Sequence, residues 1–148
     1  VMTKPVAILA GLVLAGTAAA QSTPVGLWKT IDDETRKEKS HVRILETAGV
    51  LSGRIEKLLD PATKQDSVCE KCTDERKDQP VVGLTILRAV RHNPDDPALW
   101  DGGDILDPNN GKIYRVRLRP IEDGRKLEVR GYVGAPLFGR TQTWLRVE

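Results

Sequence analysis

The fold of this chain is decided by residues 113–133, which read IYRVRLRPIEDGRKLEVRGYV. In the first half, Tyr114, Val116 and Leu118 alternate with arginines, and the alternation of apolar and polar residues resumes after a turn at residues 122–124. A two-residue repeat places the two sets of side chains on opposite faces of a strand. The segment therefore predicts an antiparallel hairpin with one buried face and one face in water.

Outside this hairpin, most of the chain consists of further candidate strands joined by short turns. With the two arms of the hairpin they make eight, and the others lie at residues 26–31, 40–47, 50–59, 81–90, 98–106 and 141–147. Eight strands that pair with their sequence neighbours can close into a small barrel, which removes both edges. We predict an all-β fold, a single antiparallel up-and-down β-barrel of about eight strands, and an open sandwich is the alternative.

The beginning of the chain has the pattern of a secretory signal peptide over residues 1–20. Lys4 is followed by an uncharged, mostly apolar stretch of 12 residues, and Ala18 and Ala20 occupy the small-residue positions of a cleavage site. That stretch is shorter than the roughly 20 residues that a spanning helix needs. We expect cleavage between Ala20 and Gln21, a periplasmic or secreted protein, and one barrel domain over residues 21–148.

The composition excludes some classes of partner. The formal net charge is +2 and the charges are interspersed, unlike the concentrated basic surface of a nucleic-acid binder. After the first 20 residues the sequence contains no segment that could span a membrane. Aromatic residues make up 4% of the chain, which argues against a wide aromatic-lined pocket.

Cys69 and Cys72 are the two cysteines of the chain, and they lie in a long polar loop at residues 60–80. In an exported protein we favour a structural disulfide that pins this loop. Two alternatives stay open. A zinc site would need two further ligands, and a redox-active dithiol would need the motif at the start of a helix, where the helix dipole lowers the thiol pKa.

The sequence contains no recognisable catalytic motif. His41 and His92 are far apart, and neither G-x-S-x-G nor H-E-x-x-H occurs. We therefore expect no enzymatic activity, no cofactor and no metal.

One outer strand face carries a row of basic residues that lipid headgroups or acidic glycans could contact. We favour a solvated face instead, because Glu122 and Glu128 lie close by in the sequence and oppositely charged pairs are ordinary on sheets. The row consists of Arg115, Arg117, Arg119 and Arg130.

The chain resembles family 2147 of the domains of unknown function, which are small exported bacterial proteins. The resemblance is carried by residues 24–28, Cys69 and Cys72, Gly83, Trp100, residues 103–108, Gly111, Tyr114, and residues 127–132 and 139–144. It implies a periplasmic or secreted protein, and within it we expect structural roles for Gly26, Trp28, Trp100, Asp107, Gly111, Gly131, Arg140 and Trp144.

A looser resemblance is to the lipocalins, through Gly26-x-Trp28 and a basic residue near the last strand. It implies an eight-stranded barrel with a ligand cavity. We expect Trp28 to close one end of the barrel under the side chain of Arg146 or Arg140, in a cation–π contact.

Three functional hypotheses follow, and the least favoured is an enzyme that uses Cys69 and Cys72 in thiol exchange, which would need a low thiol pKa in the reduced protein. In the first, the barrel binds a small apolar or amphipathic molecule, and a cavity of about 300 Å³ or more would favour it. In the second, a filled barrel docks a protein partner in the cell envelope through residues 60–80 and 134–140, and an exposed apolar patch at residues 135–138 would favour it. The first predicts a cavity lined by Val42, Ile44, Leu84, Ile86, Tyr114, Val116, Leu118, Leu127 and Val129.

Overall fold

The computed structural model describes residues 2–8, 10–13 and 22–148. Across these residues every regular element is a β-strand, and the strands form one antiparallel sheet. They are β1 (Gly26–Ile31), β2 (Glu38–Thr47), β3 (Val50–Leu58), β4 (Thr85–His92), β5 (Trp100–Asp101), β6 (Asp104–Leu106), β7 (Ile113–Ile121), β8 (Lys126–Tyr132) and β9 (Gly139–Arg146).

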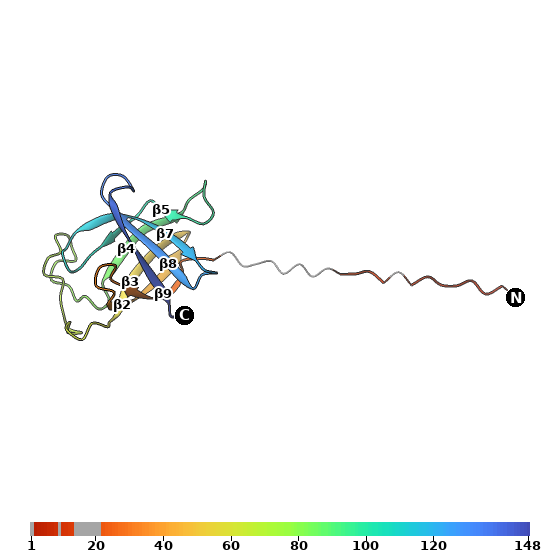
Figure 1. Ribbon diagram of the computed structural model, residues 1–148, viewed down its shortest axis with the longest axis horizontal. Coiled ribbons are helices and arrows are strands. Elements are labelled where there is room, and N and C mark those ends of the chain that lie inside the picture. The colour runs from red at the N-terminus through yellow and green to blue at the C-terminus, as the bar shows by residue number, and fades with distance from the viewer. Residues whose placement is uncertain (1, 9, 14–21) are drawn as a thin grey trace.

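The sheet closes on itself. Strands that follow one another in sequence pair with each other, except β5 with β6, and β1 pairs with β9 to complete the circle (Figure 1). Because β5 and β6 both lie between β4 and β7, they share one position, and the barrel has eight positions around its circumference. This confirms the predicted antiparallel eight-stranded barrel over the open sandwich.

The expected strand at residues 98–106 is interrupted at two glycines. Gly102 has a left-handed backbone, with φ of +83°, and a Cβ on Gly103 would lie 2.0 Å from the carbonyl oxygen of Arg88. A side chain at Gly103 would therefore collide with β4. The break lets β5 and β6 stay beside the same two neighbours without a continuous strand.

The strand expected at residues 81–90 begins and ends later in the structure than predicted, as β4. It begins at Thr85, and residues 81–84 form a turn in which Leu84 N donates to Val81 O. Ile86 and Leu87 are both buried, and the pairing of β3 with β4 shifts register twice. The two-residue period of a regular strand therefore does not hold through the start of β4, since an irregular register breaks it.

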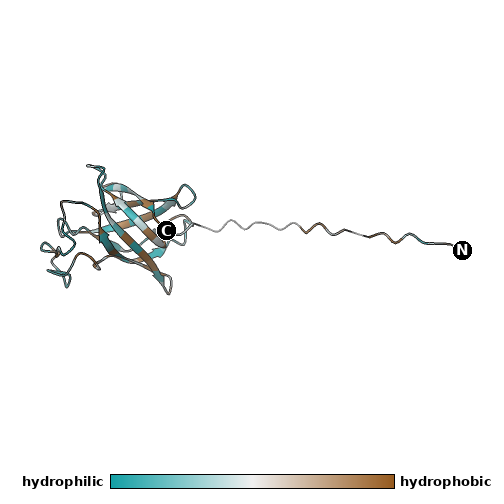
Figure 2. Ribbon diagram, turned by 90° about the horizontal axis from the view of Figure 1, so that it is seen from below, coloured by the Kyte–Doolittle hydropathy of each residue, from teal (hydrophilic) through white to brown (hydrophobic). Residues whose placement is uncertain are grey.

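The hairpin at residues 113–133 has the expected faces as far as Gly131, whereas Tyr132, expected on the face in water, is buried. Val116, Leu118, Leu127 and Val129 are buried, and Leu118 lies opposite Val129 across the β7–β8 pair. Coloured by hydropathy, the strands alternate between hydrophilic and hydrophobic residues (Figure 2). The inward set forms the hydrophobic core.

One end of the barrel is closed by Trp28. Its side chain is fully buried, and its Nε1 donates to Pro24 O at 2.7 Å. The Arg146 guanidinium lies 4.2 Å from the centroid of the Trp28 ring and donates to Gly124 O, Val25 O and Thr23 O. This confirms the expected cation–π contact and assigns it to Arg146.

The loop between β3 and β4 packs against the barrel at the end away from Trp28. Cys69 and Cys72 form a buried disulfide within it. The disulfide segment rests on the β6–β7 turn, where Gly111 has a φ of +72° and a Cβ would lie 1.8 Å from Lys71 O. The loop is also tied to β4, because Arg76 is buried, binds Asp74 and donates to Thr85 O at 2.9 Å. The hydrogen bond from the Arg76 guanidinium lowers the pKa of Asp74 to about 2.

Residues 2–8 and 10–13 lie outside the barrel and are exposed (Figure 1). The expected cleavage site at Ala18, Ala20 and Gln21 lies outside the described residues. Within the described part of the chain, no helix is both long enough and apolar enough to cross a membrane.

We expect Arg146→Met to lower the free energy of unfolding by about 3 kcal/mol, because hydrogen bonds to charged groups contribute about 1.5–3 kcal/mol each and the cation–π contact adds to them. Urea unfolding followed by tryptophan fluorescence would measure the loss. Arg91→Met, at an exposed position of β4, is the control and should change stability by about 0.5 kcal/mol or less. Equal losses in the two variants would contradict the assigned role of Arg146.

Candidate functional site

A cavity of about 600 Å³ occupies the end of the barrel opposite Trp28. Its walls come from the ends of β1, β3, β6 and β8, from the beginnings of β2, β4, β7 and β9, and from the connections at that end. The lining residues are Thr30, Asp32, Asp33, Lys39, Ser40, Ile55, Leu58, Asp60, Thr63, Ser67, Val68, Val81, Ile86, Ile105, Leu106, Asp107, Pro108, Asn109, Asn110, Tyr114, Val129, Gly131, Tyr132, Val133, Phe138, Gly139, Arg140, Gln142 and Trp144.

The deep part of the cavity is mainly apolar. Buried side chains of Ile55, Ile86, Leu106, Val129 and Trp144 line it. These positions belong to five different strands, so the apolar surface surrounds the space on several sides. Such a surface is suited to the apolar body of a ligand.

A few polar groups interrupt this apolar wall. Thr30 and Ser40 are both buried, and their hydroxyl oxygens lie 2.8 Å apart in a hydrogen bond across the β1–β2 pair. Gln142 accepts a hydrogen bond from Trp144 Nε1 at 3.0 Å. Because the hydroxyl and amide groups have partners within the wall, they are held in place there.

Charged residues surround the mouth. Arg140 binds the Asp33 carboxylate with two hydrogen bonds of 2.7 and 2.9 Å, and Lys39 lies 3.1 Å from Asp60. The Arg140 guanidinium lowers the pKa of Asp33, and the backbone N–H of Ala62 lowers the pKa of Asp60. Both carboxylates therefore stay ionised to lower pH than usual.

Aromatic residues are concentrated at this cavity. Tyr114, Tyr132, Phe138 and Trp144 are four of the six aromatic residues in the chain. The expectation drawn from the low aromatic content is therefore wrong. Composition counts residues but does not locate them, and the barrel brings the few that exist to one end.

The nine residues predicted to line a cavity fall into two groups. Ile86, Tyr114 and Val129 do line it. The other six are buried in the packed part of the interior, toward Trp28 and under the β3–β4 loop, and they are Val42, Ile44, Leu84, Val116, Leu118 and Leu127. Alternation along a strand predicts which side chains point inward, but not how deep the packing extends.

The residues expected to be structural also divide between the two ends. Asp107, Gly131, Arg140 and Trp144 line the cavity. Trp100 lies at the closed end, where its ring stacks on His92 with 4.6 Å between the centroids. Gly26 is also at the closed end, and a Cβ on it would lie 2.4 Å from Arg146 Nη1.

Sequence reasoning left out Thr30, Ser40, Tyr132 and Gln142 from the lining. A usable signal was present for one of them. Arg140, Gln142 and Trp144 alternate along β9 and share one face, so a cavity lined by Arg140 and Trp144 is also lined by Gln142.

The disulfide favours the structural interpretation of the cysteine pair. Both cysteines are buried, and Cys69 Sγ lies 3.8 Å from Pro108 O in the β6–β7 turn. The segment between them contains no helix. Within the described residues, no group of three or more histidine, cysteine or acidic side chains is placed to hold a metal ion.

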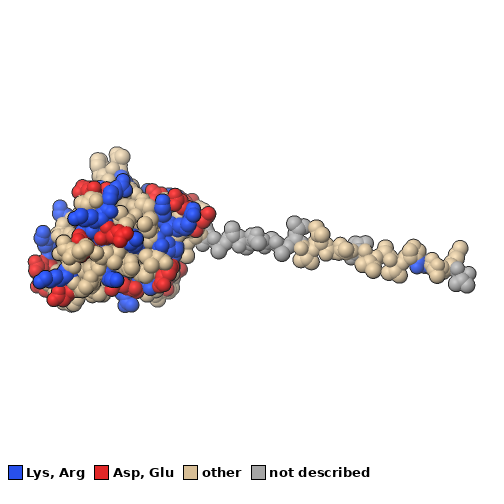
Figure 3. Space-filling view, turned by 60° about the horizontal axis from the view of Figure 1, so that its bottom comes forward, with Lys and Arg blue, Asp and Glu red and all other residues tan. Residues whose placement is uncertain are grey.

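The arginines of the outer strand face make separate contacts. Arg119 pairs with Asp96 at 3.0 Å, and Arg130 donates to Pro136 O at 2.6 Å and to Thr141 Oγ1 at 2.8 Å. The face of the barrel seen in the space-filling view carries interspersed acidic and basic side chains (Figure 3). The solvated face remains the simpler interpretation of this row.

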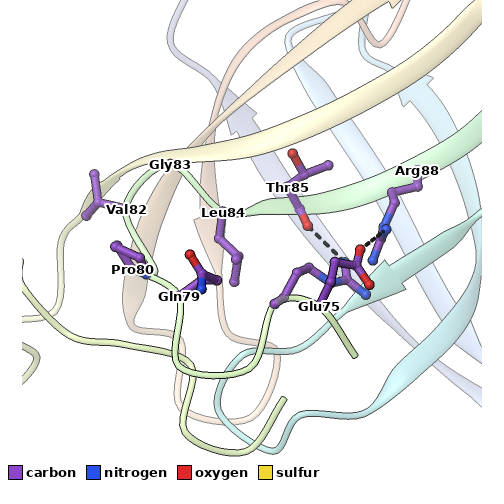
Figure 4. A pocket seen from close by; sticks show the side chains of 9 residues that line it. Glu75, Gln79, Pro80, Val82, Gly83, Leu84, Thr85 and Arg88 are labelled. Carbon is purple, nitrogen blue, oxygen red and sulfur yellow. Dashed lines mark hydrogen bonds and ion pairs between the residues drawn. The ribbon is translucent and has the colours of Figure 1, made fainter. Parts of the chain in front are cut away.

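A second hollow, of about 470 Å³, lies where residues 75–84 meet β4 (Figure 4). Arg76 donates to Thr85 O in this hollow, and Arg88 pairs with Glu75 at 2.6 Å. Because these charged groups bind one another, the hollow is better described as the anchor of the loop than as a ligand site.

The fold is shared with a solved structure. Protein HP1028 from the human pathogen Helicobacter pylori, described as belonging to the lipocalin family, superposes with a TM-score of 0.72 at 19% identity, over 86% of this chain and 84% of that one. The likeness shows a lipocalin-like fold. No curated protein matches the sequence.

The part of the chain that matches a known protein family spans all nine strands of the barrel. Residues 26–146, from the first residue of β1 to the last of β9, match the family described as "Uncharacterized protein conserved in bacteria (DUF2147)". The resemblance found in the sequence is confirmed, and this chain belongs to that family.

Proposed function

We propose that this protein is an exported, non-catalytic barrel that binds a small apolar or amphipathic molecule. The observation that carries the proposal is the cavity of about 600 Å³. Its size lies within the roughly 300–1,000 Å³ usual for ligand sites, and such sites combine apolar walls with a few placed polar groups. The wall of Ile55, Ile86 and Val129, with the Thr30–Ser40 hydroxyl pair, fits that description.

The packed half of the barrel supports the proposal in a different way. Trp28, Val42, Ile44, Leu118 and Leu127 fill the interior at the closed end. A close-packed base of this kind resists collapse of the space above it. The cavity is therefore built into a rigid support, which lowers the cost of ligand binding.

Export can be tested with the full chain expressed in a bacterial host. We expect the periplasmic fraction to contain a protein that begins at Gln21, because residues 1–20 have the three parts of a signal peptide. Intact mass spectrometry of protein purified without reductant would measure the start of the chain. A full-length chain in the membrane fraction would contradict the proposed cleavage.

Gly131→Leu should remove ligand binding. A Cβ at this position would lie 3.5 Å from Tyr114 Cβ and 3.8 Å from Ile105 Cγ2, so it fits, and a longer side chain would enter the cavity that all three residues line. We expect N-phenylnaphthylamine, a neutral fluorescent probe, to bind the unmodified protein and to bind this variant at least about tenfold more weakly, a loss of about 1.4 kcal/mol.

Gly131→Ala is the matched control, because it adds the same Cβ at ordinary contact distances and leaves the cavity open. Probe fluorescence should be close to that of the unmodified protein. If the probe binds all three proteins with one affinity, it does not bind in the cavity and the proposal fails.

An exposed apolar loop favours a second candidate function, docking of a protein partner in the cell envelope. Leu137 is 80% exposed and Phe138 is 69% exposed, beside the mouth of the cavity. Exposed apolar clusters of this kind often mark interaction sites. Arg130 holds the loop in place through its bond to Pro136 O, so the apolar side chains are presented on an ordered segment.

The two functions make different predictions for Leu137→Ser combined with Phe138→Ser. If the loop docks a partner, crosslinking in the periplasm of the native host should capture a protein with the unmodified chain and with Gly131→Leu, but not with the serine variant. Capture that is unchanged in the serine variant would contradict docking through this loop.

A further inference from the structure

The mouth of the cavity carries more negative than positive charge. The charged residues that line it are four aspartates and two basic residues, and they are Asp32, Asp33, Lys39, Asp60, Asp107 and Arg140. The chain as a whole has a formal charge of +2. The surplus of carboxylates is therefore a local property of this end of the barrel and not a consequence of composition.

Both basic residues of the mouth are already engaged. Arg140 binds Asp33 through two nitrogens and also lies 3.3 Å from Glu34, while Lys39 is paired with Asp60. Among the lining residues that the structure describes, this leaves no unpaired cation for the head of an anionic ligand. A carboxylate or phosphate entering here would have to displace one of these ion pairs.

The two remaining aspartates form no ion pair within 4 Å with any residue that the structure describes. Asp32 Oδ1 accepts hydrogen bonds from the backbone N–H groups of Glu34 and Thr35, and Asp107 Oδ1 accepts one from Asn109 N–H. The bonds from Thr35 lower the pKa of Asp32, so its charge persists. Within the described part of the chain, Oδ2 of each carboxylate has no hydrogen-bond partner.

The aromatic side chains supply an independent argument. The faces of tyrosine, phenylalanine and tryptophan rings carry negative potential and attract ammonium groups, most strongly where water is excluded. Tyr114, Tyr132, Phe138 and Trp144 all line this cavity. Rings and unpaired carboxylates together form a surface that is complementary to a positive charge.

We propose that the ligand of this cavity is an amphipathic cation, an apolar chain or ring system that carries an ammonium group. Its apolar body lies against Ile55, Ile86 and Val129, and its ammonium lies at the mouth, between Asp32 after β1 and Asp107 after β6 on the opposite side. This inference rests on the proposed binding function and adds the charge of the ligand to it.

Three amphiphiles with the same alkyl chain would test the inference on the mature protein. Dodecyltrimethylammonium, dodecanoate and the nonionic dodecyl tetraethylene glycol ether would each be titrated, below their micelle concentrations, against bound N-phenylnaphthylamine at neutral pH. We expect the cation to bind at least about tenfold more tightly than dodecanoate, a difference of about 1.4 kcal/mol, with the nonionic compound between them.

The combination Asp32→Asn and Asp107→Asn removes the two charges. Asparagine keeps the Oδ1 acceptor that each turn uses, so the fold is preserved. We expect the affinity for the cation to fall to that of the nonionic amphiphile, whose own binding stays unchanged. The control is Asp95→Asn with Asp123→Asn, which makes the same change in net charge on exposed residues at the closed end.

The outcomes separate the inference from the function on which it rests. If dodecanoate binds as tightly as the cation, or if the mouth and control variants respond alike, the inference fails while the binding barrel stands. If the probe and all three amphiphiles fail to bind the unmodified protein, both fail. The comparison of the three amphiphiles on the unmodified protein decides the sign of the preference without any variant.

Discussion

The contact between Arg146 and Trp28 is the interaction on which the rest of the barrel depends. One guanidinium covers the indole ring and satisfies carbonyl oxygens of the segment before β1 and of the β7–β8 turn. It thereby joins the beginning of the sheet, its end and a turn between them. Hydrogen bonds from a charged donor are about twice as strong as neutral ones, which suits a single side chain that holds three segments.

With that end closed, the empty space collects at the other end. The inward positions nearest the mouth include Thr30, Ser40 and Gly131, whose side chains are too small to fill the interior. Deeper positions on the same strands carry larger groups, such as Trp28 on β1 and Leu127 on β8. The cavity therefore exists because side chains become smaller along the strands from the closed end to the mouth. One half of the barrel interior is a packed core, and the other half is a cavity.

Much of this fold could be predicted from the sequence, because strand periodicity is a local property. Periodicity predicted the pairing of the hairpin at residues 113–133. It also predicted the strand at Gly26–Ile31 with the correct bounds. The errors occur where contacts between distant segments decide the structure. β4 begins late because residues 81–84 turn against β3. The strand expected at residues 98–106 breaks at two glycines, and a side chain at the second, Gly103, would collide with the carbonyl oxygen of Arg88. Of the cavity, alternation predicted Ile86, Tyr114 and Val129, but Thr30 and Ser40 read as ordinary polar residues until the barrel closes around them.

The closed end is also where the two ends of the barrel chain meet. Glu148 O accepts a hydrogen bond from Leu27 N, and Arg146 reaches Thr23, so residues 23–27 and 146–148 lie side by side, far from the mouth. A linker, a fluorescent reporter or a solid support fused at either terminus would therefore leave the opening unobstructed. Joining the termini and recutting the chain at the exposed Ala48–Gly49 turn, which is at the same end, would give a circular permutant with the same orientation.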